Sequence, residues 1–236
     1  MNKQKLQQSM YELRDPSTAQ RLTLATLNLA WVALAWWLLF GGGIAVVGGW
    51  LGRAWVAGDA ARRACLFAGF CIYYVRILLT EFVFLKRGIG WSEVFTVAPW
   101  VFCIVALLGI AGGMNSAALH VSGTSGILLF AVGSWMNSSA EYTRHAWKQR
   151  PENRGRLYTG GLFRYSRHPN YFGDLLSFSG LCLISGAWVT AVVPLVMLAG
   201  FVFVNIPVLD SHLRDHYGAA FDEYARRTRK LIPFVY

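Results

Sequence analysis

The sequence predicts an all-α integral membrane protein, a polytopic bundle of about six (5–7) transmembrane helices. Three observations predict it. Of the 236 residues, 55% are apolar and only 14% are charged, whereas soluble domains are about 25% charged. Apolar runs close to the ~20 residues that cross a bilayer recur along the chain. Lys and Arg are concentrated in the segments between and after these runs.

The chain begins with a polar lead, residues 1–21, that is amphipathic or irregular. Because it lacks an early apolar region, we expect no cleavable signal peptide. A first span is predicted at 22–41. The glycine-rich stretch Gly41–Gly52 that follows is apolar but a poor helix former, so it is either a re-entrant segment or a continuation of the span.

Five further spans follow from the apolar runs. They are predicted at 64–85, 93–112, 126–140, 171–187 and 189–209. The link between the last two is so short that they form a helical hairpin. We expect a single transmembrane domain over 1–236, in which 1–125 lies on the substrate side and 126–236 forms a cofactor-binding half.

The distribution of Lys and Arg predicts the orientation in the membrane, because such residues favour cytoplasmic loops. Segment 141–169 contains seven of them and the C-terminal tail contains five, so both are predicted to be cytoplasmic, together with the N-terminus. Arg53, Arg62 and Arg63 disagree, since six spans would place them outside, and the span count near 41–63 stays open. The same rule accounts for the net charge of +10 without nucleic acid.

Ionisable residues within a predicted span are costly and often mark a site. Tyr73 and Arg76 lie three positions apart and share a helix face, whereas Glu81 points elsewhere. One interpretation is a polar clamp between helices. The other is a polar group facing a substrate cavity, in which Tyr73 donates a proton or polarises a carbonyl.

Three spans bring polar residues to a similar depth on the cytoplasmic side. Asn137 and Glu141 end the 126–140 span, Asp174 lies one turn into the next span, and Asp210 ends the last one. Such a convergence is typical of a site for a polar ligand group. The four cysteines lie in apolar segments without a CxxC pair, so we expect buried thiols rather than a disulfide or metal site.

A basic segment immediately precedes the 171–187 span. Pro169 is suited to the first turn of a helix, and Arg164, Arg167, His168 and Asn170 cluster around that start. A helix N-terminus has free N–H groups and a positive dipole end, which favour anions such as phosphate.

The sequence from Gly161 to Asp174, Gly-Leu-Phe-Arg-Tyr-Ser-Arg-His-Pro-Asn-Tyr-Phe-Gly-Asp, closely resembles the bacterial branch of the steroid 5-alpha-reductase-like membrane proteins. Sterol C14 reductases and isoprenylcysteine or phospholipid methyltransferases share a shorter Arg-His-Pro core. The resemblance covers about residues 130–236, including the ending Leu-Ile-Pro-Phe-Val-Tyr.

The resemblance implies a cofactor site for NADPH or, if the methyltransferases are the nearer relatives, for S-adenosylmethionine. The longer motif and the dense arginines favour NADPH. Asp210 stands alone where the methyltransferases carry an acidic pair, which disfavours them. The implied cofactor-binding residues are Asn137, Glu141, Lys148, Arg164, Arg167, His168, Asn170, Tyr171, Asp174, Asp210, His212 and Tyr224.

We therefore predict an NADPH-dependent reductase of an activated carbon–carbon double bond in a lipophilic, steroid-like or isoprenoid substrate. An S-adenosylmethionine-dependent membrane methyltransferase is the alternative. Tyr73 and Glu81 are the predicted catalytic residues; the acidic residue that the reductases carry in their first helices has no counterpart in 22–41. The expected partners are this substrate and the lipid bilayer, of a bacterial inner membrane, with no nucleic acid, metal or obligate protein partner.

Overall fold

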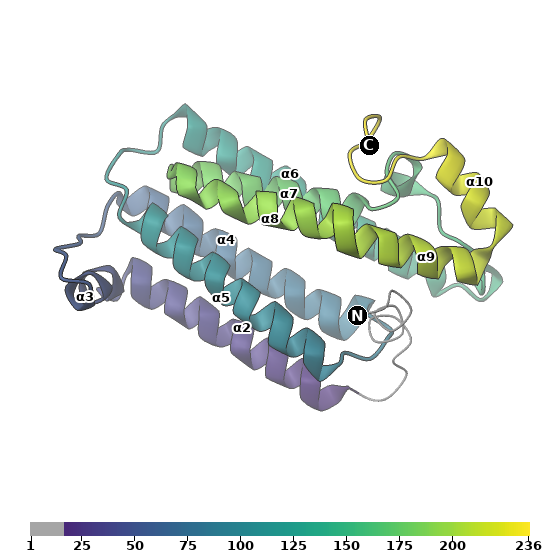
Figure 1. Cartoon of the computed structure of the whole chain (residues 1–236), viewed down its shortest axis with the longest axis horizontal. Coiled ribbons are helices and arrows are strands. Elements are labelled where there is room, and N and C mark those ends of the chain that lie inside the picture. The colour runs from purple at the N-terminus through teal and green to yellow at the C-terminus, as the bar shows by residue number, and fades with distance from the viewer. Residues whose placement is uncertain (1–16) are drawn as a thin grey trace.

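A computed structural model describes residues 17–236, and within them the chain is helical with no β-strand (Figure 1). The helices are α2 (Thr18–Leu39), α3 (Gly43–Trp50), α4 (Ala60–Leu79), α5 (Trp91–Gly113), α6 (Val121–Lys148), α7 (Pro169–Ser185), α8 (Val192–Gly200), α9 (Ile206–Tyr217) and α10 (Ala219–Arg227). Two π-helical segments, η1 (Thr80–Phe84) and η5 (Phe201–Asn205), extend α4 and join α8 to α9, and 3-10 turns occur at η2 (Pro151–Asn153), η3 (Gly161–Arg164) and η4 (Trp188–Ala191).

The crossing helices form two layers (Figure 1). One contains α2, α4 and α5, and the other contains α6, α7 and the continuous rod from η4 to α9. Four helical rods are long and apolar enough to cross a membrane, namely Thr18–Leu39, Ala60–Phe84, Trp91–Gly113 and Trp188–Tyr217. With α6 and α7 running alongside them, the predicted all-α membrane bundle of about six helices is confirmed.

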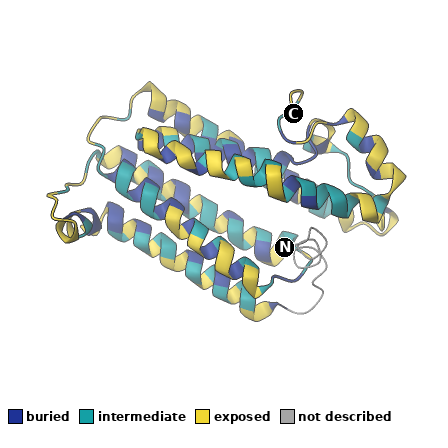
Figure 2. Ribbon diagram, viewed as in Figure 1, coloured by how far each residue is buried: buried dark blue, intermediate teal, exposed yellow. Residues whose placement is uncertain are grey.

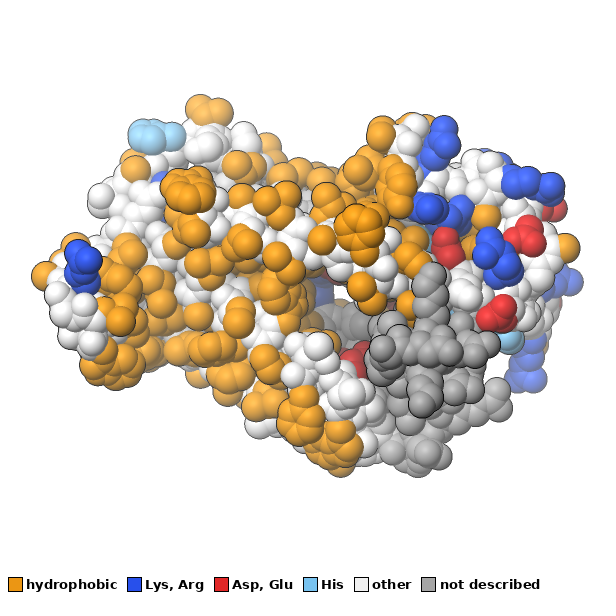
Figure 3. All heavy atoms as spheres, in the orientation of Figure 1, with side chains coloured by type: hydrophobic (Ala, Val, Ile, Leu, Met, Phe, Trp, Pro, Cys, Tyr) orange, Lys and Arg blue, Asp and Glu red, His pale blue; other side chains and the backbone are white. Residues whose placement is uncertain are grey.

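The outside of the bundle is apolar around its middle, as a lipid-facing surface requires. Large side chains such as Phe102 and Phe203 are exposed there, while the core cluster of Leu66, Phe178 and their neighbours lies between the layers (Figure 2). Charged side chains gather at one end, over α9 and α10 (Figure 3). We call this the basic end; α2, α5 and α7 begin there.

Most span boundaries agree with the predictions within a few residues. The main difference is α6, predicted as 126–140, which begins at Val121 and continues to Lys148. The polar lead predicted for residues 1–21 falls mostly outside the described residues. The Gly41–Gly52 stretch does not continue the first span: Gly42, with a φ of +80°, turns the chain into the separate helix α3. Eight residues rise only about 12 Å, so α3 does not cross the bundle.

Arg62 and Arg63 lie at the end opposite the basic end, where the positive-inside rule does not place them. Their guanidinium groups bind backbone carbonyls at the ends of α2 and α7 and in the loop between α5 and α6. Arg62 is buried and donates to the carbonyls of Ile184 and Ala117, and Arg63 donates to Leu39 at 2.5 Å. Because helix C-termini carry unsatisfied carbonyls and a negative dipole end, these arginines serve as helix caps.

Glycines allow α6 and α7 to approach closely. A Cβ atom at Gly133 would lie 2.5 Å from the Gly173 carbonyl oxygen, and one at Gly180 would lie 2.5 Å from that of Gly126. The two glycines of each helix are seven residues apart, so they lie on one face. Small residues at such contacts let transmembrane backbones pack together, and here they hold α6 and α7 in register.

Candidate functional site

Helix α7 brings the recognised motif to the basic end. His168 is its N-cap and Pro169 occupies its first turn, where the missing N–H has no cost. Asn170 and Asp174 follow four residues apart, so they lie on one face, directed toward α6 and α4. Two polar clusters form around these side chains.

The transmembrane cluster consists of Tyr73, Arg76, Ser134, Asp174 and Ser177. Arg76 Nη2 donates to Asp174 Oδ1 at 2.5 Å, and Nη1 lies 3.3 and 3.4 Å from the hydroxyls of Ser134 and Ser177. This arrangement fixes a cation between the two layers. The Arg76 Nε atom is buried and has no partner among residues 17–236.

Tyr73 lies beside this fixed cation. Its ring centroid is 5.9 Å from Arg76 Cζ and 5.0 Å from the Phe178 ring, which it meets edge to face. The Tyr73 hydroxyl forms no hydrogen bond with any described residue. A phenol held by its ring and left with an unused hydroxyl is able to donate to a ligand.

The basic-end cluster consists of Asn137, Glu141, Arg144 and Asn170. Asn170 Nδ2 donates to Glu141 Oε1 at 2.9 Å, and Arg144 donates to the other oxygen of the same carboxylate. Asn137 Nδ2 donates to the Asn170 carbonyl at 3.1 Å. The structure therefore brings together four polar residues of α6 and α7, three of which the sequence singles out.

A cavity of about 290 Å³ adjoins this cluster between α6 and the end of η1, and we call it the α6 cavity. Lys86, Arg144 and Lys148 line it, together with Phe84, Glu141, His145 and Gln149. Glu141 is the single carboxylate of the lining, and it already binds Arg144 and Asn170. The cavity is therefore cationic, which favours phosphate groups.

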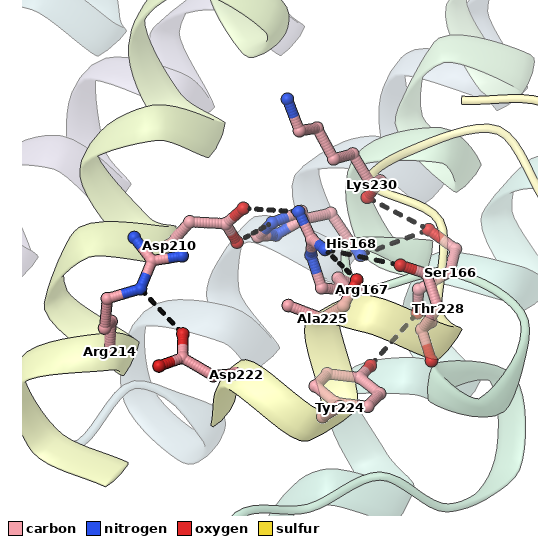
Figure 4. Close-up of polar contacts among 10 residues, drawn as sticks. All are labelled: Ser166, Arg167, His168, Asp210, Arg214, Asp222, Tyr224, Ala225, Thr228 and Lys230. Atoms are coloured by element: carbon pink, nitrogen blue, oxygen red, sulfur yellow. Dashed lines mark hydrogen bonds and ion pairs between the residues drawn. The ribbon is translucent and has the colours of Figure 1, made fainter. Parts of the chain in front are cut away.

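Three of the predicted residues, Arg167, His168 and Asp210, form a third polar group, which we call the brace (Figure 4). Asp210 of α9 accepts from Arg167 Nη2 at 2.7 Å and pairs with His168 Nε2 at 2.9 Å. The other Arg167 amino group donates to the carbonyls of Ala225, at 3.0 Å, and Thr228. These contacts tie the start of α7 to α9, α10 and the C-terminal segment.

His168 is almost completely enclosed in the brace, with 1% of its surface exposed. Burial lowers the pKa of its imidazole, and the hydrogen bond to Asp210 only partly opposes this effect. Nε2 of the neutral ring then carries the proton and donates to the Asp210 carboxylate.

Tyr224 and Tyr171 complete the packing around the brace. The Tyr224 hydroxyl donates to the Phe163 carbonyl at 2.7 Å, and burial raises its pKa. Tyr171 stacks between His168 and Phe201, with centroid distances of 5.4 and 4.6 Å and nearly parallel planes.

Four predicted residues belong neither to the two clusters nor to the brace and the packing around it. Glu81 is buried within η1, its Oε2 atom has no partner among the described residues, and its charged neighbours are Arg21 and Glu93. Lys148 donates to the Tyr217 hydroxyl at 2.7 Å although it also lines the α6 cavity. His212 stacks on His216, and Arg164 is exposed.

Sequence reasoning missed two residues of the transmembrane cluster, Ser134 and Ser177. A signal for them existed. Ser134 precedes Asn137 by three positions and Ser177 follows Asp174 by three, so each shares the face of a residue that was recognised. No group of His, Cys, Asp or Glu suited to a metal ion occurs within residues 17–236.

Known proteins with similar sequences include both reductases and a methyltransferase. A probable O-methyltransferase of Ustilaginoidea virens is 36% identical over 104 residues, which cover 43% of this chain and 36% of the relative. A steroid 5-alpha-reductase of Gossypium hirsutum is 29% identical over 118 residues, 48% of this chain and 42% of its own length. A 3-oxo-5-alpha-steroid 4-dehydrogenase 1 of Rattus norvegicus is 27% identical over 190 residues, 75% and 69% respectively.

The chain thus spans less than half the length of the first two relatives. These similarities confirm the resemblance that the motif at 161–174 predicts. A family profile described as "Protein of unknown function (DUF1295)" matches residues 89–228, from the start of α5 through α10. Since that match covers more than half of the sequence, including the α6 and α7 residues of both clusters, the chain belongs to the DUF1295 family.

Proposed function

We propose that the protein is an NADPH-dependent reductase of an activated carbon–carbon double bond in a lipophilic, steroid-like or isoprenoid substrate. One observation carries the proposal: an unengaged phenol, Tyr73, lies against a fixed cation, Arg76, in the bundle core. Asn170 and Asp174, one turn apart on α7, connect this pair to the cationic α6 cavity.

The residues around the α6 cavity fit NADPH. Lys86, Arg144 and Lys148 would hold its phosphate groups, because ammonium and guanidinium groups form strong charge-assisted hydrogen bonds with phosphate. Asn170 and Glu141 would bind amide or ribose hydroxyl groups. When bound, the nicotinamide supplies a hydride to one carbon of the double bond.

Tyr73 and Arg76 act on the other end of the conjugated substrate. The Tyr73 hydroxyl donates to the carbonyl oxygen and stabilises the negative charge that develops there. The Arg76 cation, held by Asp174, lies next to the ring and favours that charge. Apolar neighbours such as Phe178 exclude water, which strengthens both interactions.

The proposal assigns the two halves of the chain different tasks. Residues 1–125 supply Tyr73 and the substrate side, whereas 126–236 supply most of the cofactor site. The basic end faces the cytoplasm of a bacterial inner membrane, in accordance with the positive-inside rule. A reporter protein that is active only in the cytoplasm should therefore be active when it is fused after Tyr236.

Equilibrium binding in detergent tests the cofactor. NADPH is expected to bind and S-adenosylmethionine is not, and Lys148→Gln should weaken NADPH binding about tenfold or more, since a hydrogen bond to a charged group contributes roughly 1.5–3 kcal/mol. Arg150→Gln, an exposed change outside the cavity, is the matched control. Binding of S-adenosylmethionine without NADPH would refute the proposal.

An S-adenosylmethionine-dependent methyltransferase is the second candidate. The similarity to the probable O-methyltransferase supports it, as do the two carboxylates Glu141 and Asp174, which suit a cationic ligand. The lone Asp210 and the cationic lining of the α6 cavity favour the reductase.

A further inference from the structure

A second cavity, of about 500 Å³, lies between α9, α10 and the C-terminal segment, and we call it the α9–α10 cavity. The brace forms its inner wall. Its charged lining residues are Arg167, Asp210, Arg214, Asp222, Arg226 and Lys230. Val202 and Ile206 form an apolar part of the wall.

Cationic side chains outnumber carboxylates in the lining of this cavity. Both carboxylates are already paired, Asp210 with Arg167 and Asp222 with Arg214 at 2.9 Å. Arg226 and Lys230 form no ion pair with any residue from 17 to 236. The Lys230 ammonium points away from the brace (Figure 4).

One buried donor adds to this imbalance. The Arg167 side chain is 7% exposed and lines the cavity, yet its Nε atom has no partner among the described residues. An anion in the cavity would neutralise Arg226 and Lys230, the two cations without an ion pair.

The position of the cavity along the rod Trp188–Tyr217 places it at a membrane surface. The rod Trp188–Tyr217 has 30 residues, but about 20 residues suffice to cross the hydrocarbon core. Counted from Trp188, the rod leaves the core near Pro207, which also lines the cavity. Val202 and Ile206 are therefore at acyl-chain level, and Arg214 is at headgroup level.

The C-terminal segment beside the cavity has the composition of a membrane-interface anchor. Phe234 and Val235 are 76% and 73% exposed, and the Phe234 ring contacts the exposed Tyr165 at 5.7 Å. Near the C-terminus, hydrophobic side chains lie next to Lys and Arg side chains on the visible face (Figure 3). Aromatic and basic residues combine in this way at the boundary between lipid and water.

We propose that the α9–α10 cavity binds the phosphate headgroup of an anionic phospholipid. Arg226 and Lys230 hold the phosphate, and the acyl chains lie along Val202 and the exposed Phe203 of the lipid-facing rod. This lipid is separate from the proposed cofactor, because the α9–α10 cavity and the α6 cavity share no lining residue.

The combination of a cationic and an apolar part in the cavity favours a lipid over a soluble phosphate. A free phosphate gains nothing from the apolar wall at Val202 and Ile206, whereas a phospholipid occupies both the cationic and the apolar parts. An anionic headgroup, such as that of phosphatidylglycerol, gains more than the zwitterionic phosphatidylcholine, because basic residues near a membrane surface attract net negative charge.

Thermal stability in detergent tests the proposal, with phosphatidylglycerol and phosphatidylcholine of identical acyl chains added in increasing amounts. We expect phosphatidylglycerol alone to stabilise the parent protein. The double variant Arg226→Gln/Lys230→Gln should bind it about thirtyfold more weakly, since each basic residue near a membrane surface contributes ~1 kcal/mol. The variant should keep the parent's affinity for NADPH, so a failure here is distinguishable from a failure of the proposed reductase.

The matched control is Arg150→Gln/Arg154→Gln, which removes the same charge from exposed positions outside the cavity. It should respond to phosphatidylglycerol as the parent does. An equal loss in both double variants would mean that only overall charge attracts the lipid, and would overturn the proposal. Glycerol phosphate or NADPH displacing the lipid would overturn it as well.

Native mass spectrometry of the parent protein is a second test of the proposal, and it requires no variant. The parent should retain phosphatidylglycerol in preference to phosphatidylcholine under the same titration. Equal retention of the two lipids would also overturn the proposal.

Discussion

The Arg76 guanidinium of α4 lies 2.5 Å from the Asp174 carboxylate of α7, and the two side chains are only 9% and 22% exposed. This ion pair joins the α2–α4–α5 layer to the α6–α7 layer at the height of Tyr73. It therefore contributes to stability and, in the proposed reaction, to the electrostatics around the phenol.

Replacing Asp174 by Asn should destabilise the protein by about 3–5 kcal/mol, because an uncompensated guanidinium remains buried. The melting temperature in detergent measures this loss. The double replacement Arg76→Met/Asp174→Leu should restore most of the stability without restoring activity, since apolar pairs of similar volume often equal a buried ion pair. A double variant as unstable as Asp174→Asn would contradict this account.

Tyr73→Phe should lower turnover about 10²-fold or more while leaving NADPH affinity unchanged, because it removes only the proton donor. The Phe ring keeps the contact with Phe178, so the fold should be preserved. Steady-state kinetics with a conjugated enone, together with NADPH binding, measure both effects. Tyr74→Phe is the control, and an equal loss of turnover in it would remove Tyr73 from the mechanism.

Arg167→Ala should destabilise the protein by about 3–5 kcal/mol, because it breaks a buried pair with Asp210 and frees two carbonyls. The family resemblance, in contrast, assigns Arg167 to the cofactor site, where its loss would weaken binding of the cofactor. Arg164→Ala, an exposed change three positions away, should stay within about 0.5 kcal/mol of the parent. Denaturation of both variants decides between the two expectations, and equal stability would contradict the structural role.

Acidification should destabilise the protein through His168. Its pKa in the folded protein is lowered, chiefly by burial, whereas that of an unfolded histidine is about 6.5. As the pH falls through ~6.5, the unfolded chain takes up a proton that the folded chain does not, so the free energy of unfolding decreases.

Melting temperatures between pH 7.5 and pH 5.5 should therefore fall for the parent and fall less for His168→Gln, which does not titrate. Exposed His120 at the opposite end provides the control, because His120→Gln should follow the parent. An unchanged pH profile in His168→Gln would contradict the inference.

A Cβ atom at Gly180 would meet the α6 backbone, so Gly180→Ala should cost about 1–3 kcal/mol. Gly49→Ala is the matched control, because a Cβ there meets nothing within 4 Å and should be tolerated. Thermal melting of the two variants distinguishes a close contact from a general intolerance of larger residues.

The sequence predicts the spans and most of the α6–α7 site because both depend on local patterns. Apolar runs mark the helices, and the spacing from Asn137 to Glu141 and from Asn170 to Asp174 puts each pair on one face. Contacts between residues of different helices do not depend on local patterns. The sequence does not show that Arg62 caps α7, or that Arg167 holds Asp210 and the C-terminal segment, because these partners lie 43 to 122 residues away.

Charge counting failed at Arg62 and Arg63 for a physical reason. The positive-inside rule applies to cations free to stay in the loop, whereas these two are bound by helix carbonyls. The sequence does contain a signal for the glycine contacts between α6 and α7, because Gly126 and Gly133 have the same seven-residue spacing as Gly173 and Gly180.

Backbone contact at two levels leaves α6 and α7 with no compressible side-chain layer between them. The pair therefore moves as one rigid body, and any opening that admits a substrate has to occur elsewhere. The α4–α7 seam is different, because side chains such as Tyr73 and Phe178 separate the backbones and are able to change rotamer. The half of the site on α6 and α7 is thus preformed, and the layer containing α4 is the part that adapts to what binds.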